Sequence, residues 1–186
     1  MLHYIEEYGK YVEITGYRNI AFAKAETFLK ASRKQTLQNI EIQFFEAELI
    51  ATEEHLYFAV LNALQAFRSK TNLSKSVAME TILFASAQRQ IQKSIECIGI
   101  KPESRNMAVI IAGEDPKQIE AQLKALTQCL GSEPNIAVLK LTEGKQKKIR
   151  EIFEITEDEI KTENSCIEKA IVNLVIEHVA LLATQL

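Results

Sequence analysis

An uninterrupted run of six apolar residues, 107–112, constrains the fold of this chain more than any other feature. A short continuous apolar run of this kind is typical of a strand in the middle of a sheet. The residues after it predict a turn and a helix, with Asp115 as the N-cap and Pro116 in the first helical position. That helix is expected to reach about Leu130, where Gly131 ends it.

The remaining elements follow from alternation and from capping residues. Strands are expected at 11–17, 40–45 and 135–141, and a polar connection at 32–38. Helices are expected at 20–31 after Asn19, at 53–67 after Thr52, at 143–153, and at the C-terminus from about residue 163. A capping box at 156–159, with Ile155 and Ile160 as its hydrophobic staple, opens a helix before the last one. A second such signal, Ser165-x-x-Glu168, opens the last helix, which is either continuous with the one before it or kinked from it. The order of elements predicts one α/β domain over residues 1–186, with a mixed β-sheet of about four to five strands flanked by helices.

The stretch 79–100 carries the most specific local pattern. An apolar block runs into a small elbow at Ser86 and Ala87, and Ile91, Ile95 and Ile98 follow at helical spacing. We expect Ser86 to accept hydrogen bonds from the first amides of this second helix, which would begin near residue 87 or 88 and end at Gly99.

The first turn of that expected helix holds no acid. It contains Gln88, Arg89 and Gln90, and free N–H groups at a helix N-terminus together with a cation favour an anionic ligand. An ordinary serine-capped surface helix explains the same residues.

Several kinds of chemistry find no support in the sequence. The six glycines are isolated, which excludes a phosphate-cradling loop, and the three histidines lack metal-ligand spacing. The three cysteines, Cys97, Cys129 and Cys166, form neither a disulfide framework nor a metal knuckle, which favours a reducing cytoplasm. The apolar segment 170–182 is too short and too polar to span a membrane. We therefore expect no enzyme, no metal and no cofactor.

Charge is distributed unevenly along the chain. The net charge is −3, but residues 66–105 hold seven basic residues against three acids, and residues 140–150 hold five against one. Two basic islands on a weakly acidic protein suit a local anionic partner, although solvated faces also collect such charges by chance.

The motif M-E-x-x-L-x-A-S-x-Q-R-Q-I at 79–91, followed by I-x-x-I-G-x-K at 95–101, resembles the small tRNA-binding subunit of the KEOPS complex. The eukaryotic form of that family is the PRPK-binding protein, and this chain is more similar to the archaeal form. Three further stretches fit in the right order: A-T-E-E-H at 51–55 with Ala59 and Ala63, the strand at 107–111, and R-E-I-F at 150–153.

This resemblance implies a noncatalytic subunit of an assembly that places a threonylcarbamoyl group on tRNA. A kinase-like ATPase subunit would be its direct partner, the transferase subunit an indirect one, and the 3′ CCA end of tRNA its nucleic-acid ligand. The implied binding residues are Ser86, Ala87, Gln88, Arg89, Gln90, Ile91 and His55.

Two departures from the family pattern accompany the resemblance. The family often has Gly where this chain has Ala87, and basic residues where it has Glu53 and Glu54. The C-terminal helix is a candidate for the kinase surface, but burial in the chain's own core explains it equally. A protein that only binds and activates the kinase, without RNA, is the alternative function.

Overall fold

The computed structural model describes residues 1–34 and 40–184, so most of the expected connection at 32–38 lies outside the described residues. One four-stranded sheet has the order β1 (Leu2–Ile5), β2 (Lys10–Tyr17), β4 (Met107–Gly113) and β3 (Glu41–Glu46). The predicted α/β class and strand number are confirmed. Every pairing is antiparallel, so the sheet is not mixed, and the edge strand β1 was not predicted.

Strand β4 lies at the centre of the sheet, as its apolar run predicts. All seven of its residues are buried, and it pairs with β2 on one side and β3 on the other. Ile110, for example, faces Ile14 across one pairing and Gln43 across the other. A strand buried on both faces requires helices on both sides of the sheet.

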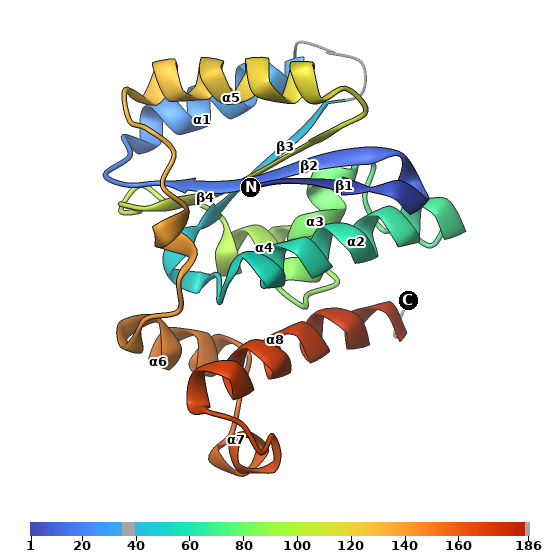
Figure 1. The fold of residues 1–186 in the computed structure, drawn as a ribbon, viewed down its shortest axis with the longest axis vertical. Coiled ribbons are helices and arrows are strands. Elements are labelled where there is room, and N and C mark those ends of the chain that lie inside the picture. The colour runs from blue at the N-terminus through green and yellow to red at the C-terminus, as the bar shows by residue number, and fades with distance from the viewer. Residues whose placement is uncertain (35–39, 185–186) are drawn as a thin grey trace.

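The helices form three layers around the sheet (Figure 1). Helices α1 (Phe22–Lys34) and α5 (Pro116–Leu130) cover one face. Helices α2 (Glu53–Ser69), α3 (Val77–Ala85) and α4 (Ile91–Ile98) cover the other. An outer layer of α6 (Glu143–Ile152), α7 (Glu157–Thr162) and α8 (Ile167–Thr184) packs behind α2 and α3. Among the described residues no helix combines the length and apolarity needed to cross a membrane.

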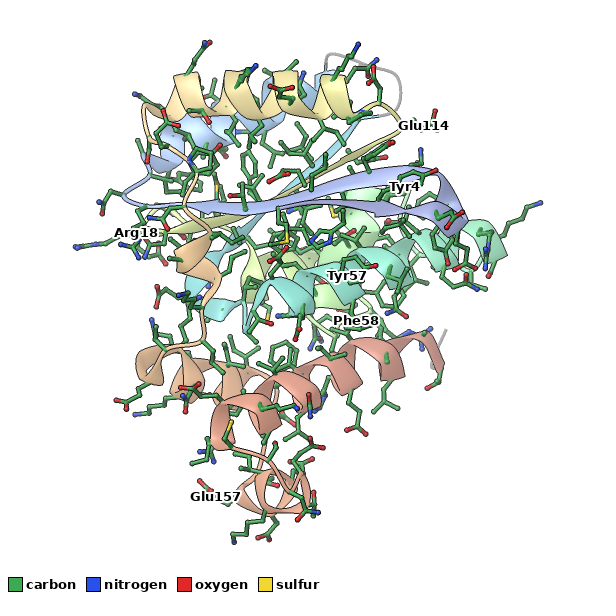
Figure 2. All side chains as sticks on the ribbon, in the orientation of Figure 1. Tyr4, Arg18, Tyr57, Phe58, Glu114 and Glu157 are labelled. Atoms are coloured by element: carbon green, nitrogen blue, oxygen red, sulfur yellow. The ribbon has the colours of Figure 1, made fainter. Side chains whose placement is uncertain are left out.

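Side chains fill the spaces between these layers (Figure 2). Separate buried clusters lie between the sheet and α1 with α5, between the sheet and α2 with α3, and inside the outer layer. Ala51, just before α2, belongs to the third cluster, so the start of α2 is in contact with the outer layer.

Three predicted helix starts are confirmed by their caps. The Thr52 side chain accepts from the His55 amide, Asp115 accepts from the Lys117 amide, and Thr156 forms the expected capping box with Glu159. Each cap satisfies amides that have no partner inside the helix.

The start of the first helix was predicted wrongly, and the last helix begins a few residues later than about 163, within the second capping signal at 165–168. Asn19 is not a cap: its φ is +52°, and α1 begins at Phe22, three residues later. The C-terminal helix expected from about 163 begins at Ile167, after α7 has ended at Thr162.

The strand expected at 135–141 is also wrong. Residues Ile136–Leu139 form the short 3-10 helix η3, because the Asn135 side chain accepts a hydrogen bond from the Ala137 amide and turns the chain. Four apolar residues in a row are compatible with either structure, and only the local turn decides between them.

Gly16 lets η3 lie directly on β2. A Cβ at this position would lie 2.0 Å from Val138 Cγ2 and 3.0 Å from the Met107 carbonyl oxygen. We therefore expect Gly16→Ala to lower the free energy of unfolding by about 1 to 3 kcal/mol, as other overpacked sites do. The measurement is the urea concentration at which half of the protein is unfolded, compared between the variant and the wild type.

Gly144→Ala is the matched control, because a Cβ on this α6 residue meets nothing within 4 Å. It should leave stability unchanged or raise it by up to about 1 kcal/mol through helix propensity. Equal midpoints for Gly16→Ala and the wild type would contradict the close packing of η3 on β2.

Candidate nucleic-acid interface

The turn that joins α3 to α4 has the geometry of a Schellman motif. Ala87 occupies the left-handed region with φ of +51°. Its amide donates to the Phe84 carbonyl at 3.0 Å, and the Gln88 amide donates to the Leu83 carbonyl at 3.0 Å. These two bonds satisfy carbonyls that the end of a helix leaves without partners.

Ser86 ends α3 and does not cap the following helix, so the expected role of Ser86 is wrong. Its hydroxyl is buried and donates backwards, to the Ile82 carbonyl at 2.8 Å and the Leu83 carbonyl at 3.1 Å. A serine hydroxyl can bond either way, and here the preceding helix provides the partners. The second helix therefore begins at Ile91, three to four residues later than expected.

The N-terminus of α4 carries no side-chain cap and no acid in its first turn. Helical geometry leaves the amides of Ile91, Gln92 and Lys93 without partners inside the helix. Arg89, Gln90 and Ile91 are exposed at this end, while Gln88 is half-buried. Arg89 makes no ion pair with any residue in the described ranges 1–34 and 40–184. The helix end and the cation expected from the sequence are thus both accessible, but the expected serine cap is absent.

Ser94 fixes this end of the helix from inside. Its side chain is fully buried, and its hydroxyl donates to the Gln90 carbonyl at 3.0 Å. The Gly99 end also behaves as predicted, since α4 stops at Ile98. Gly99 has extended backbone, and a Cβ there would lie 2.5 Å from the Ile95 carbonyl oxygen.

The three isoleucines of α4 do not all face the same way. Ile98 is buried, but Ile91 is 38% exposed and Ile95 is 42% exposed. Ser94 and Ile98, which are one turn apart, face inward, whereas Ile91 and Ile95, also one turn apart, face solvent. This gives the site an apolar surface beside its cation.

His55 lies beneath the turn and cannot touch a ligand directly. Its side chain is 0% exposed. Its Nε2 donates to the Ala85 carbonyl at 2.8 Å, and its Nδ1 accepts from the Ala51 amide at 3.3 Å. The ring of Phe153 packs edge-on, with the ring centres 5.6 Å apart. Burial lowers the pKa of His55 to about 4, only partly opposed by the bond to Ala85, and the charge on Lys145 lowers it further.

The basic island at 140–150 is mostly occupied by internal interactions. Lys145 is 3% exposed, and its ammonium donates to the Val138 carbonyl at 2.5 Å and to the Ile50 carbonyl at 3.3 Å. Burial lowers the pKa of Lys145 to about 8. Lys148 and Arg150 form ion pairs with Glu48 and Glu157.

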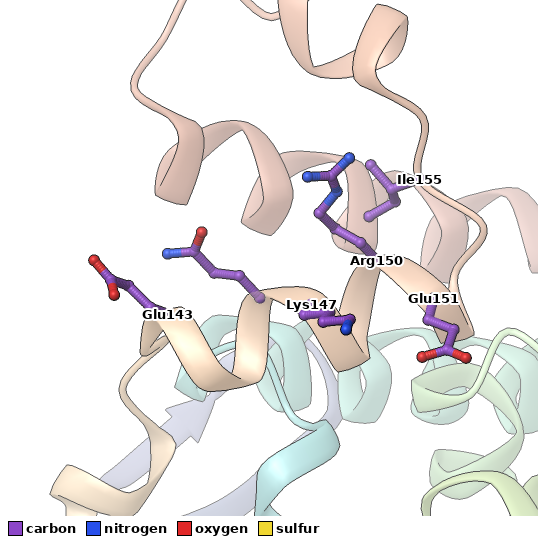
Figure 3. Close-up of a pocket in the computed structure, with 6 residues that line it drawn as sticks. Glu143, Lys147, Arg150, Glu151 and Ile155 are labelled. Atoms are coloured by element: carbon purple, nitrogen blue, oxygen red, sulfur yellow. The ribbon is translucent and has the colours of Figure 1, made fainter.

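A pocket of about 490 Å³ is lined by residues of α6 and by Ile155 (Figure 3). The side chains of Glu143, Lys147, Arg150 and Glu151 contribute two carboxylates and two cations to its wall. Arg150 already bonds Glu157 at 2.6 Å. A wall with balanced charge gives no preference for phosphate. Across the described part of the chain, no group of three or more His, Cys, Asp or Glu side chains is placed to hold a metal ion.

Sequence reasoning missed two residues that shape this region. Nothing in the pattern marks Ser94 as the internal bond of α4. Lys145 did carry a signal: it precedes the buried Ile149 by four residues, and therefore lies on the same face of α6.

The fold and the turn together define a class: an α/β protein with an antiparallel sheet, an added outer helical layer and an exposed, uncapped cationic helix start. The chain belongs to the protein family described as "Kinase binding protein CGI-121", which it matches over residues 17–182. It is 33% identical over 116 residues to the "Regulatory protein Cgi121" of Methanocaldococcus jannaschii, an alignment that covers 62% of this chain and 72% of that relative. The resemblance found in the sequence is therefore confirmed at the level of the family.

The left-handed backbone at Ala87 gives a stability prediction. An L-residue pays roughly 1 to 2 kcal/mol in this conformation, whereas glycine does not. Ala87→Gly loses some packing against the outer-layer cluster, so we expect a net gain of about 0.5 to 1 kcal/mol in unfolding free energy. A urea titration measures it. A variant less stable than the wild type would mean that the packing of the methyl group outweighs the backbone strain.

The buried His55 makes stability depend on pH. Its pKa is about 4 in the folded protein and near its ordinary value of 6.5 in the unfolded chain, so the unfolded chain binds more protons between these values. The stability that the protein gains from keeping His55 neutral is fully present above pH 6.5 and is lost as the pH falls towards 4. The free energy of unfolding should fall by about 3 kcal/mol over this range. Comparing urea denaturation of the wild type and His55→Gln at pH 7, 5.5 and 4.5 isolates this residue. Parallel pH profiles would contradict a neutral buried histidine.

Proposed function

We propose that this chain is a noncatalytic subunit of the KEOPS tRNA-modifying assembly. In this proposal it binds the kinase-like ATPase subunit directly, reaches the transferase subunit only through it, and holds the 3′ CCA end of tRNA at the turn before α4. The single observation that carries the RNA part is the exposed, uncapped start of α4 beside Arg89.

The phosphates of a single-stranded end match the polar half of this site. The amides of Ile91, Gln92 and Lys93 and the guanidinium of Arg89 all favour an anion, and no acid in the first turn opposes it. The exposed amide of Gln90 both donates and accepts, so it can bond the edge of a base.

The bases of such an end match the apolar half. Unpaired bases in RNA are free to leave their stack and lie against protein side chains. Ile91 and Ile95 offer an exposed apolar surface on the same helix that carries the free amides. His55, implied by the family resemblance as a binding residue, is fully buried and therefore has no direct part in this contact.

The kinase part of the proposal rests on the family description, which names kinase binding. The C-terminal helix α8 contributes most of its apolar residues to the protein's own core, including Ile171, Val175 and Val179. Its large exposed apolar residues are Ile167 and Leu181. The alternative, an adaptor that activates the kinase without touching RNA, predicts that substitutions at the α4 start leave every activity unchanged.

Arg89→Ala tests the RNA contact. Removing a charge-assisted hydrogen bond at the helix start should weaken tRNA binding by about tenfold to a hundredfold and leave the fold and kinase association intact. The slope of affinity against salt should fall by roughly 0.7, the value for one phosphate contact on a single strand. Fluorescence anisotropy with intact tRNA and with tRNA lacking its CCA end measures both effects.

Two control variants make the result specific. Lys124→Ala removes an exposed cation from α5, on the other face of the sheet, and should not change binding. Lys75→Ala, in the loop between α2 and α3, should have a smaller effect than Arg89→Ala because an exposed loop cation is largely screened. Equal affinities of wild type and Arg89→Ala at two salt concentrations would exclude this site and leave the adaptor function.

A further inference from the structure

The peptide group between Ile50 and Ala51, just before α2, is held at both ends by buried basic side chains. Its carbonyl accepts from the Lys145 ammonium at 3.3 Å, and its N–H donates to His55 Nδ1 at 3.3 Å. Since Nδ1 accepts, the ring proton is on Nε2, which donates to the Ala85 carbonyl at 2.8 Å. A continuous chain of hydrogen bonds thus runs from α6 through the start of α2 to the last residue of α3.

The Ala85 carbonyl is the point at which this chain meets the candidate site. The last turn of α3 leaves four carbonyls to be satisfied. Those of Ile82, Leu83 and Phe84 bond to amides of the turn itself, at residues 86–88. The carbonyl of Ala85 is bonded by His55, which comes from another helix. His55 therefore makes the long-range hydrogen bond at the end of α3. This bond fixes the direction in which the polypeptide leaves the helix and enters the turn.

The α6 end of this chain of hydrogen bonds is also anchored at two points. Lys145 also donates to the Val138 carbonyl at 2.5 Å, so one ammonium joins α6, η3 and the residue before Ala51. Both side chains are buried, at 3% exposure for Lys145 and 0% for His55. Hydrogen bonds in such a setting are stronger than in water and polarise one another.

We propose that His55 and Lys145 are positioning residues for RNA binding, which act through the peptide group between Ile50 and Ala51 to hold the turn at 86–90. This inference rests on the proposed function, because the turn is the proposed RNA contact. It assigns the histidine of the A-T-E-E-H stretch a role that requires its burial: His55 sets where Arg89 lies and does not meet the ligand.

The test uses the full chain and two separate measurements. Hydrogen exchange of the Ala87 and Gln88 amides reports on the turn without any RNA. Anisotropy with 3′-labelled tRNA, at a temperature where every variant is folded, reports on binding. His55→Leu removes both bonds of the ring while keeping an apolar side chain of similar size, and Lys145→Met removes the ammonium from the other end.

His55→Leu should accelerate exchange of the two turn amides at least about tenfold relative to the β4 amides, and should weaken RNA binding by about 2- to 10-fold. Lys145→Met should act in the same direction on both measurements. The double variant should fall short of the product of the two effects, because both act on one peptide group. His55→Gln can still donate to Ala85 and should restore most of the affinity.

Ile119→Ala is the control for a general loss of stability. It leaves a cavity in the buried cluster beneath α5, on the other face of the sheet. That variant should melt at a lower temperature but exchange the turn amides and bind RNA as the wild type does. If His55→Leu exchanges these amides no faster than Ile119→Ala, the hydrogen-bond chain does not hold the turn. Should His55→Leu fail to fold, Lys145→Met carries the same comparison.

The two measurements also distinguish this inference from the proposed function. Faster exchange with unchanged RNA affinity would overturn the positioning role while leaving RNA binding in place. If the wild type itself does not bind RNA, the proposed function fails, and with it the role given to His55 and Lys145, even where the exchange data show that they hold the turn.

Discussion

The structure depends on the burial of β4 on both faces. A strand with seven buried residues needs an apolar partner above and below, and α1 with α5 provides one while α2 with α3 provides the other. Because β4 has antiparallel neighbours on both sides, β2 and β3 are fixed in register along its length. The helices that carry the candidate site are thus packed against a regular antiparallel sheet, and a site held on such elements is positioned more precisely than one on loops.

The outer layer contributes some of the residues that lie beneath the turn before α4. Helices α6 and α8 pack behind α2, and their contact with the core includes buried polar groups as well as apolar side chains. Phe153, at the end of α6, lies between the rings of His55 and His178, with ring centres 5.6 Å and 5.9 Å apart. The residues beneath the turn are therefore drawn from three separate parts of the chain.

The sequence predicted those features that are determined locally. The apolar run of β4 and the caps at Thr52, Asp115 and Thr156 depend on residues within a few positions of each other, and all are confirmed. The sequence also indicated an accessible helix start without acids near Arg89, although Arg89 lies before α4 and not in its first turn.

The features that the sequence did not predict depend on contacts between residues far apart in the chain. Ser86 can bond forwards or backwards, and the choice depends on how α3 ends, which in turn depends on a histidine thirty positions earlier. Lys145 shares a helix face with Ile149, but only the fold shows that its ammonium is buried against carbonyls of residues 50 and 138. The exposure of Ile95 was not predicted either, since helical spacing alone does not reveal which side of a helix faces solvent.

The Schellman turn has an electrical consequence. Two helix dipoles meet there, the negative end of α3 and the positive end of α4, separated by only five residues. The carbonyls at the end of α3 are all engaged, by the turn amides and by His55, so its negative end is turned inward and partly neutralised. The amides of α4 have no such partners in their own helix and face solvent. In the proposed complex, an approaching RNA strand would meet a one-sided field, which would attract its phosphates to the α4 side and orient it before any base is in contact.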